Sequence, residues 1–171
     1  MNPWLGVEGY HCFGCCPTNS HGVKMEFYAD ADGVVSYWSP ESCYQGWVNV
    51  LHGGIQAVLL DEVCAWAVME RLSTSGVTMR METRYRHSVS VDEPYLVLRA
   101  HVEEVRRNLV TVVATLADST GKVCTEATCT YFVFSHEKAQ EMGFTGLAMA
   151  DEDLTEAEVL ARMGLTAAAK G

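Results

Sequence analysis

The segment from His52 to Leu72 limits the possible folds more than any other part of the chain. It begins with two glycines and then carries apolar residues at almost every position as far as Met69. The polar exceptions over that length are Gln56, Asp61 and Glu62. A helix that lacks a polar face must be surrounded by protein. The rest of the chain is therefore expected to enclose this helix.

The segments on either side of the helix have the two-residue period of strands. Before it, Val23, Met25 and Phe27 alternate with polar residues, residues 30–33 form a turn, and a second strand covers 34–38. After it, further strands are predicted at 77–85, 96–102, 110–116 and 123–133, joined by short connections that favour an antiparallel meander. In the strand at 77–85, the odd-numbered residues are expected on one face and Thr78, with the other even-numbered residues, on the opposite face.

These elements predict an α+β fold in which one antiparallel sheet of about six strands wraps around a long central helix. This is the hotdog arrangement. We divide the chain into an N-terminal cysteine-containing leader loop at 1–22, the hotdog domain at 23–135 and a helical tail at 136–171. In the tail, Thr155 and Glu158 form the pattern of a capping box, with Leu154 and Val159 as a hydrophobic staple, and Gly164 ends the short helix.

Composition excludes several classes of function. The chain has 171 residues and a net charge of −10, which argues against nucleic-acid binding because that needs clustered lysine and arginine. The longest apolar run, Val63 to Met69, is far too short to span a membrane. The first residues show no signal peptide, and the number of cysteines, seven, is odd. We therefore expect a cytoplasmic protein with reduced thiols.

The leader carries a group of residues that suggests zinc: His11, Cys12, Cys15, Cys16 and His21. A structural zinc site usually needs two ligand pairs separated by a longer spacer, and only Cys43 is a loose candidate for a second pair. We therefore predict no metal ligands, and an ordered leader loop that buries small thiols.

Candidate chemistry starts at the beginning of the helix. Gly53 and Gly54 leave the terminal N–H groups unobstructed, so these groups, with the helix dipole behind them, can stabilise a developing oxyanion. The alternative is that the glycines only permit close packing. Asp61, two turns later among aliphatic residues, is either a hydrogen-bonded structural carboxylate or a functional one. Glu62 points about 100° away from it and is expected to pair with an arginine.

The spacing of the two candidates has a consequence for assembly. Gly53 and Asp61 are separated by roughly 12 Å along the helix axis. An oxyanion donor lies about 3 Å from its oxygen, and a base or nucleophile lies about 3 to 3.5 Å from its reacting partner. One chain therefore cannot direct both groups at one carbonyl, and a catalytic site requires at least a dimer.

Three sequence motifs resemble those of the hotdog-fold acyl-CoA thioesterases of the phenylacetate-degradation type, which are similar to hydroxybenzoyl-CoA thioesterases. They are HGGIQAVLLDE at 52–62, METRYR at 81–86 and the leader CFGCCPTNSHG at 12–22. The resemblance covers about residues 10 to 135. It implies a homodimer, often paired into a tetramer, that hydrolyses thioesters without metal and without a cofactor other than the coenzyme A of its substrate. The leader departs from the pattern at Cys16, where relatives usually have glycine.

The resemblance also implies roles for individual residues. Asp61 is the catalytic nucleophile or base, and Gly53 is the oxyanion donor in a turn shaped by His52 and Gly54. Thr78 either positions water or is an ordinary threonine at the start of a strand. The loop polar residue often found six positions before the histidine is replaced here by Gly46, so Gln45 or Asn49 is expected to take its place. Trp47 and Trp66 are candidates for lining an acyl or aryl pocket, and the alternative for Trp66 is a place in the core. The arginines either bind coenzyme A phosphates or lie on a solvated strand face; they are Arg84, Arg86 and Arg107.

Two other functions remain open. The chain is either an acyl- or aryl-CoA thioesterase or a non-catalytic hotdog protein that binds acyl or aromatic ligands or coenzyme A. A hydratase or dehydratase is a third possibility, in which His52 and Asp61 would have to meet across subunits.

Overall fold

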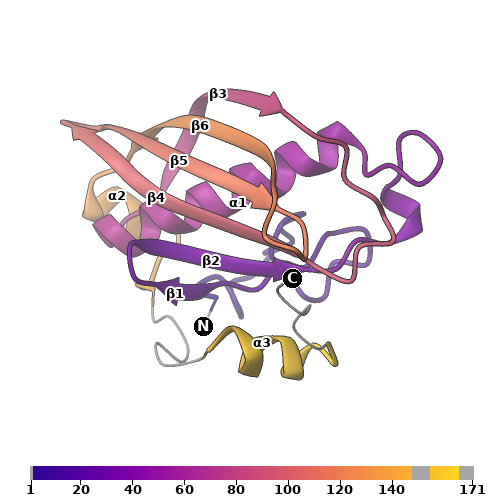
Figure 1. Cartoon of the computed structure of the whole chain (residues 1–171). Helices are drawn as coiled ribbons and strands as arrows, with labels where there is room; N and C mark the ends of the chain where they lie inside the picture. Colours follow the sequence, from indigo (N-terminus) through magenta and orange to yellow (C-terminus); the bar gives the residue numbers. More distant parts are fainter. Residues whose placement is uncertain (1, 148–154, 166–171) are drawn as a thin grey trace.

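The computed structural model of the chain describes residues 2–147 and 155–165 (Figure 1). One six-stranded antiparallel sheet has the order β1-β2-β4-β5-β6-β3. Its strands, in chain order, are β1 (Tyr28–Asp30), β2 (Gly33–Trp38), β3 (Gly76–Tyr85), β4 (Leu96–Arg106), β5 (Leu109–Ala117) and β6 (Val123–Val133). The helices are the 3-10 turn η1 (Ser42–Tyr44), α1 (Gly53–Leu72), α2 (His136–Glu141) and α3 (Glu156–Arg162).

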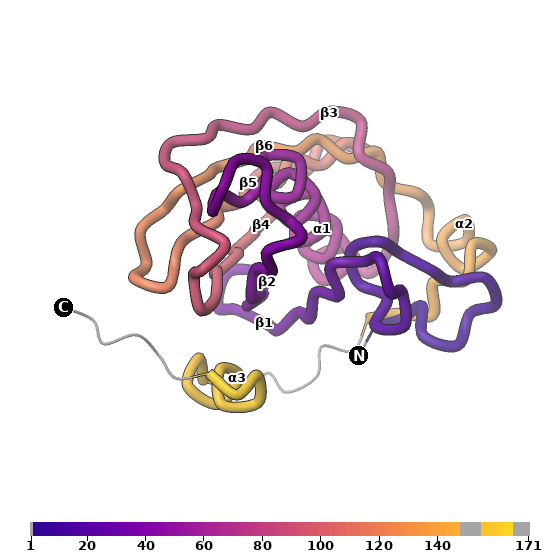
Figure 2. The backbone as a smooth tube through the Cα atoms, turned by 90° about the vertical axis from the view of Figure 1, so that its right-hand side faces the viewer, coloured from indigo at the N-terminus to yellow at the C-terminus, as the bar shows by residue number. Residues whose placement is uncertain are grey.

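Helix α1 lies in the concave side of the sheet, as the sequence predicts. Figure 2 shows the strands curving around one side of the helix, from β3 to β1, while the N-terminal segment lies on another side. Leu59, Leu60 and Val63 are fully buried in the resulting core. The helix begins after His52, whose side chain caps it, and it ends at Ser73, which adopts the left-handed conformation with φ 50°. The predicted hotdog fold is confirmed.

The prediction of a strand over residues 23–27 is wrong. The expected alternation is present, because Val23, Met25 and Phe27 are buried, but these residues do not pair with β2. Instead, the Val23 N–H donates to Phe13 O and the Met25 N–H donates to Gly14 O, both at 2.8 Å. Lys24 between them has a positive φ of 54°, which regular strands do not tolerate. The segment therefore ties the leader to the core, and β1 begins only at Tyr28.

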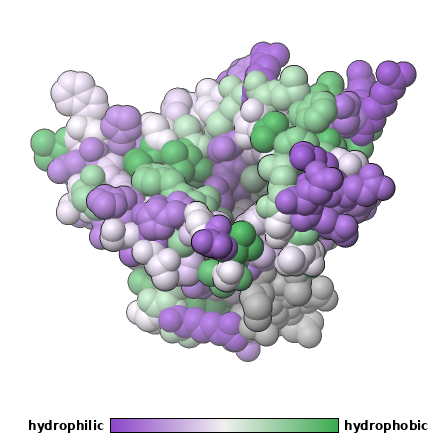
Figure 3. All heavy atoms as spheres, turned by 180° about the vertical axis from the view of Figure 1, so that it is seen from behind, coloured by the Kyte–Doolittle hydropathy of each residue, from purple (hydrophilic) through white to green (hydrophobic). Residues whose placement is uncertain are grey.

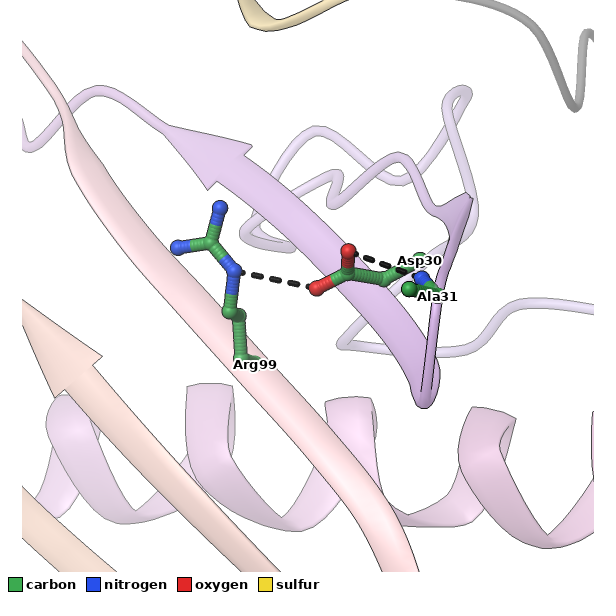
Figure 4. A network of polar contacts seen from close by, with 3 residues as sticks. All are labelled: Asp30, Ala31 and Arg99. Atoms are coloured by element: carbon green, nitrogen blue, oxygen red, sulfur yellow. Dashed lines mark hydrogen bonds and ion pairs between the residues drawn. The ribbon is translucent and has the colours of Figure 1, made fainter.

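The turn after β1 is fixed by Asp30. Its carboxylate accepts a hydrogen bond from the Ala31 N–H at 3.0 Å and pairs with Arg99 Nε at 3.0 Å (Figure 4). Arg99 belongs to β4, so the ion pair reaches across β2. Both side chains are well exposed, and such pairs contribute about 0 to 1 kcal/mol to stability.

The two helices of the tail pack on opposite sides of the sheet. Ala139 of α2 and Phe144 after it belong to the main core beside α1. Val159 and Leu160 of α3 pack on the outer face of the sheet in a second cluster with Tyr28, Val35, Tyr37, Tyr95 and Val97. The predicted capping box of Thr155 and Glu158 is confirmed. The predicted staple includes Leu154, which lies outside the described residues.

No helix in the described ranges 2–147 and 155–165 is both long and apolar enough to cross a membrane.

A buried polar pair fixes the start of α1 against the sheet. Gln56 is 4% exposed, and its Oε1 accepts a hydrogen bond of 2.5 Å from the hydroxyl of the fully buried Thr125 on β6. The Gln56 amide nitrogen donates to Leu51 O at 3.1 Å. Both halves of the Gln56 amide are therefore satisfied by groups that hold the helix start in place.

We expect Gln56→Leu to lower the free energy of unfolding by about 1 to 3 kcal/mol, because it leaves the buried Thr125 hydroxyl without an acceptor. The double variant Gln56→Leu/Thr125→Val removes both partners and is expected to recover much of that loss. Urea denaturation of the wild type, both single variants and the double variant provides the complete cycle. Additive losses would contradict the coupling.

Candidate functional site

A pocket of about 650 Å³ lies at the start of α1. His52, Gly53 and Gln56 line it from the helix side, Tyr85 and Arg86 line it from the end of β3, and Trp47, which is 84% exposed, lines it from the loop. The His52 Nδ1 accepts a hydrogen bond from the Gly54 N–H at 2.9 Å. An accepting Nδ1 carries no proton, so the ring proton of the neutral side chain is on Nε2.

Three glycines near the pocket differ in how much space a side chain would have. A Cβ on Gly54 would lie 3.0 Å from the His52 Nδ1 and would disturb the cap, and a Cβ on Gly46 would lie 3.1 Å from the same ring. A Cβ on Gly53 would meet the Tyr85 ring at 3.5 Å, which is an ordinary contact. Close packing therefore explains Gly46 and Gly54 but not Gly53.

Gly53 lines the pocket, and its two backbone polar groups differ in their hydrogen bonding. Among the described residues, no acceptor is hydrogen-bonded to its N–H. The Gly53 carbonyl, in contrast, accepts a hydrogen bond of 2.8 Å from the Tyr85 hydroxyl. Tyr85 was not predicted as a site residue, and it fixes the peptide plane that follows the open amide.

Asp61 is half-buried, and two hydroxyl groups hold its carboxylate. The Thr78 Oγ1 and the Tyr131 hydroxyl each donate to Oδ1 at 2.8 Å. The Tyr131 hydroxyl also lies 2.7 Å from the Asp61 carbonyl oxygen. Burial, followed by the Asp61 charge, raises the pKa of Tyr131 far above its usual range, so the phenol stays a neutral donor. Both donors bind one oxygen, and within the described part of the chain Oδ2 accepts no hydrogen bond.

Thr78 reaches Asp61 because β3 contains a bulge, and the predicted face of Thr78 is therefore wrong. Thr78 pairs with Tyr131 and Arg80 pairs with the adjacent Thr130, which leaves Met79 as an extra residue. The extra residue reverses the alternation. Thr78 before the bulge and Met81 after it consequently both face α1, opposite the buried Tyr131 and Cys129.

One chain does not bring Asp61 and Gly53 together. They lie eight positions apart on the same helix, and Asp61 is not among the residues that line the pocket at the helix start. The separation of roughly 12 Å stands as the sequence predicts.

The loop candidates hold the loop rather than line the pocket. Gln45 Oε1 accepts a hydrogen bond from the Asn49 N–H at 3.1 Å, and Asn49 Oδ1 accepts one from the Ser90 hydroxyl at 3.0 Å. Asn49 adopts the left-handed conformation with φ 58°. Trp66 is 3% exposed and stacks on Phe27 with 4.2 Å between the ring centroids, which gives it a core role.

The three candidate arginines do not form a cluster within one chain. Arg86 lines the pocket but forms an ion pair of 2.6 Å with Glu126. Arg84 precedes it on the exposed strand β3. Arg107 lies in the turn between β4 and β5, at the opposite end of the sheet, because Leu109 pairs with Phe132 close to where β3 begins.

Glu62 has no arginine partner, contrary to prediction. Its carboxylate lies 3.7 Å from the Cys12 Sγ and accepts a hydrogen bond of 3.3 Å from the Trp66 indole. Burial, followed by the charge of Cys12, raises the pKa of Glu62 to about 7. Hydrogen bonding from Cys15 lowers the pKa of Cys12 to about 5. The seven cysteines are free thiols.

Comparison with known proteins shows which family the central part of the chain resembles. Residues 48–125 match the family model described as the thioesterase superfamily. This segment contains the helix start, Asp61 and Thr78. This part of the chain is similar to the thioesterase superfamily. An uncharacterized protein of Schizosaccharomyces pombe is 39% identical over 54 residues, which are 31% of this chain and 31% of that protein. The match thus spans about a third of the length of this curated relative.

Solved structures of thioesterase-superfamily proteins share the fold. Zebra fish thioesterase superfamily member 2 is 26% identical, with a TM-score of 0.58 over 64% of this chain and 81% of that one. A hypothetical thioesterase of Streptococcus pneumoniae, solved with coenzyme A, is 22% identical, with a TM-score of 0.60 over 65% of this chain and 86% of that one. The protein smu.793 of Streptococcus mutans, solved with acetyl CoA, is 16% identical, with a TM-score of 0.62 over 76% and 97%.

Tyr131, like Tyr85, is a site residue that the sequence did not predict. We expect Tyr131→Phe to lower the free energy of unfolding by about 1.5 to 3 kcal/mol, because a buried donor to a charged acceptor is lost. Thr78→Val is the matched control, with an expected loss below about 1 kcal/mol, because water can replace an exposed hydroxyl. Urea denaturation measures both, and equal losses would contradict this account of the Asp61 environment.

Proposed function

We propose that the chain is a thioester hydrolase acting on acyl- or aryl-CoA, with Asp61 as the nucleophile or the base that activates water. The observation that supports this role most is the environment of the carboxylate. Neutral hydroxyl groups hold Oδ1, no cationic side chain in the described ranges forms an ion pair with it, and Oδ2 accepts no hydrogen bond there. An oriented carboxylate with a free oxygen and no paired cation can act as a base or as a nucleophile.

Relatives support the substrate class. The Streptococcus pneumoniae thioesterase was solved with coenzyme A, and the Streptococcus mutans protein was solved with acetyl CoA. The Streptococcus pneumoniae protein was also solved with one aspartate and, separately, one threonine replaced by alanine. Asp61 and Thr78 form a hydrogen-bonded pair of these two residue types in this chain.

The second half of the proposed site comes from another copy of the chain. The Gly53 N–H of one protomer stabilises the thioester oxyanion, while Asp61 of its partner acts on the carbonyl carbon. When Asp61 acts as a base, water attacks that carbon and the carboxylate takes one water proton. The C–S bond then breaks, and this proton passes to the leaving sulfur, which releases the carboxylic acid and the thiol. Arg86, which lines the same pocket, is placed to meet a coenzyme A phosphate once its pairing with Glu126 is exchanged.

Two surfaces fit a second copy. Strand β3 is ten residues long and lies at the edge of the sheet, with Val77 49% and Met79 61% exposed. Ala57, Val58 and Asp61 form a half-buried stripe on α1. On the side of the molecule opposite to that seen in Figure 1, hydrophobic residues reach the surface among hydrophilic ones (Figure 3). A homodimer joined along these surfaces, paired further into a tetramer, is the assembly that we propose.

We expect Asp61→Asn to reduce kcat about 10²- to 10⁴-fold on a panel of acyl- and aryl-CoA thioesters. The amide oxygen still accepts the hydrogen bonds from Thr78 and Tyr131, so the fold is retained and only the charge is lost. Glu70→Gln, on the exposed side of the same helix, is the matched control and is expected to keep full activity. An unchanged rate in Asp61→Asn would reject the role of this carboxylate, and coenzyme A binding without turnover in the wild type would favour a binding protein.

We expect Gly53→Pro to reduce kcat about 10²- to 10³-fold, because it deletes the oxyanion donor. Proline suits the first position of a helix, and His52 already has the extended conformation required before it, with φ −60° and ψ 133°. Gly53→Ala keeps the N–H and is the control.

Mixing the two inactive proteins tests where the site lies. A heterodimer of Asp61→Asn and Gly53→Pro protomers has one intact site if the site is shared between chains. Random reassortment of subunits then restores about a quarter of wild-type activity. No recovery, with exchange verified by native mass spectrometry, would contradict the shared site.

A further inference from the structure

The leader forms a second cluster of reactive side chains, separate from the pocket at the helix start. Cys12 and Cys15 lie beside Glu62 of α1, and the potential ligand atoms of the three residues all lie within 4.8 Å of one another. The Cys12 Sγ is 3.7 Å from each carboxylate oxygen of Glu62. Figure 2 shows the N-terminal segment on the side of α1 that the sheet leaves open. The cluster therefore joins the leader to the central helix.

The surroundings orient each of the three groups. The Gly14 N–H donates to the Cys12 Sγ at 3.2 Å, which stabilises a thiolate. The Trp66 indole donates to Glu62 Oε1, and the Tyr10 hydroxyl lies 2.9 Å from the Cys15 Sγ. A Cβ on Gly14 would lie 2.2 Å from Glu62 Oε2, so only glycine allows the carboxylate to approach this turn. Such oriented ligands with hydrogen-bonded outer partners are typical of metal sites.

No cationic side chain pairs with the cluster in the described part of the chain. Three groups that ionise to anions converge in the interior, and among the described residues no lysine, arginine or histidine hydrogen-bonds or ion-pairs with any of them. Burial of ionised groups without a counter-charge is strongly unfavourable. Such groups avoid this cost by keeping their protons, and a bound cation would displace these protons, because thiolates and a carboxylate are its ligands.

There is also room for a further ligand. A pocket of about 280 Å³ adjoins the cluster and is lined by Tyr10, Cys12, Cys15, Glu62 and Ser75, among others. Ser75 is 7% exposed, and its hydroxyl oxygen has no hydrogen-bond partner in the described part of the chain. A water molecule completing a metal coordination shell would have a polar partner there.

We propose that Cys12, Cys15 and Glu62 form a binding site for a thiophilic divalent cation, Zn²⁺ by preference. Two sulfur ligands select zinc over magnesium or calcium. The observed sulfur–oxygen distances of 3.7 Å are close to roughly 3.5 Å, which follows for tetrahedral zinc from bonds of about 2.3 Å to sulfur and about 2.0 Å to oxygen. Water fills the fourth position. The bound ion cross-links the leader to α1 next to Asp61, and binding releases the protons held by the cluster.

Metal titration of the full-length protein tests the proposal. The chain is stripped with a chelator under reducing conditions, and Zn²⁺ binding is followed by calorimetry and elemental analysis. Co²⁺ provides a spectroscopic signature, because thiolate ligands give ultraviolet charge-transfer bands and tetrahedral geometry gives strong visible bands. We expect one equivalent per chain, both sets of Co²⁺ bands and a higher Tm with metal.

Two variants and one control locate the site. Cys12→Ser and Glu62→Gln are each expected to weaken Zn²⁺ binding about a hundredfold or more and to abolish the metal-dependent rise in Tm. Cys43→Ser, which changes an exposed cysteine outside the cluster, is expected to bind as the wild type does. Circular dichroism verifies that each variant folds. Less than stoichiometric binding by the reduced wild type, or equal weakening in Cys43→Ser, would overturn the proposal.

Discussion

The enclosure of α1 determines the rest of the structure. A twenty-residue helix with so few polar positions is stable only when other elements cover it, and the curved sheet covers most of it. The leader and the segment around α2 cover further parts of the helix. Every polar side chain that this helix retains in its buried length is held by a specific partner. Gln56 anchors its start to β6, Asp61 receives two hydroxyl groups and Glu62 meets the leader thiols.

Three groups on α1 with different surroundings lie at different positions along the helix. The first turn offers an open amide to a pocket, the third holds a carboxylate at the protomer surface, and the adjacent residue faces the leader. Because α1 is rigidly packed, the separation between the amide and the carboxylate is fixed by helix geometry. The proposed chemistry can therefore be adjusted only through the way in which two copies meet.

The sequence predicts the fold well because periodicity reports burial directly. The long helix, the four strands after it and the capping box at Thr155 all follow from local patterns. The errors arise where the structure depends on contacts that a local pattern does not report. Residues 23–27 alternate as a strand does, yet their hydrogen bonds go to the leader, and pairing partners are not encoded in a local pattern. Likewise, no residue type marks the bulge that turns Thr78 toward the helix.

The site was predictable in part. Gly53 and Asp61 stand out because glycine pairs and carboxylates are unusual in such a helix. Tyr131 was predicted only as part of the strand at 123–133, since the partner of its hydroxyl group lies 70 positions away. Glu62 was expected to meet an arginine, but its carboxylate lies beside Cys12, 50 positions away in the chain. Local spacing does not report a contact over that distance.

The bulge in β3 also bears on how this chain is compared with its relatives. In a homologue that lacks the extra residue, the strand would keep its regular alternation. A threonine aligned with Thr78 would then face away from the helix. Whether a hydroxyl group reaches the carboxylate is thus decided by an insertion or deletion in the strand and not by amino-acid identity. A role can therefore be transferred to or from Thr78 only when the relative has the same number of residues between this position and the one that matches Met81.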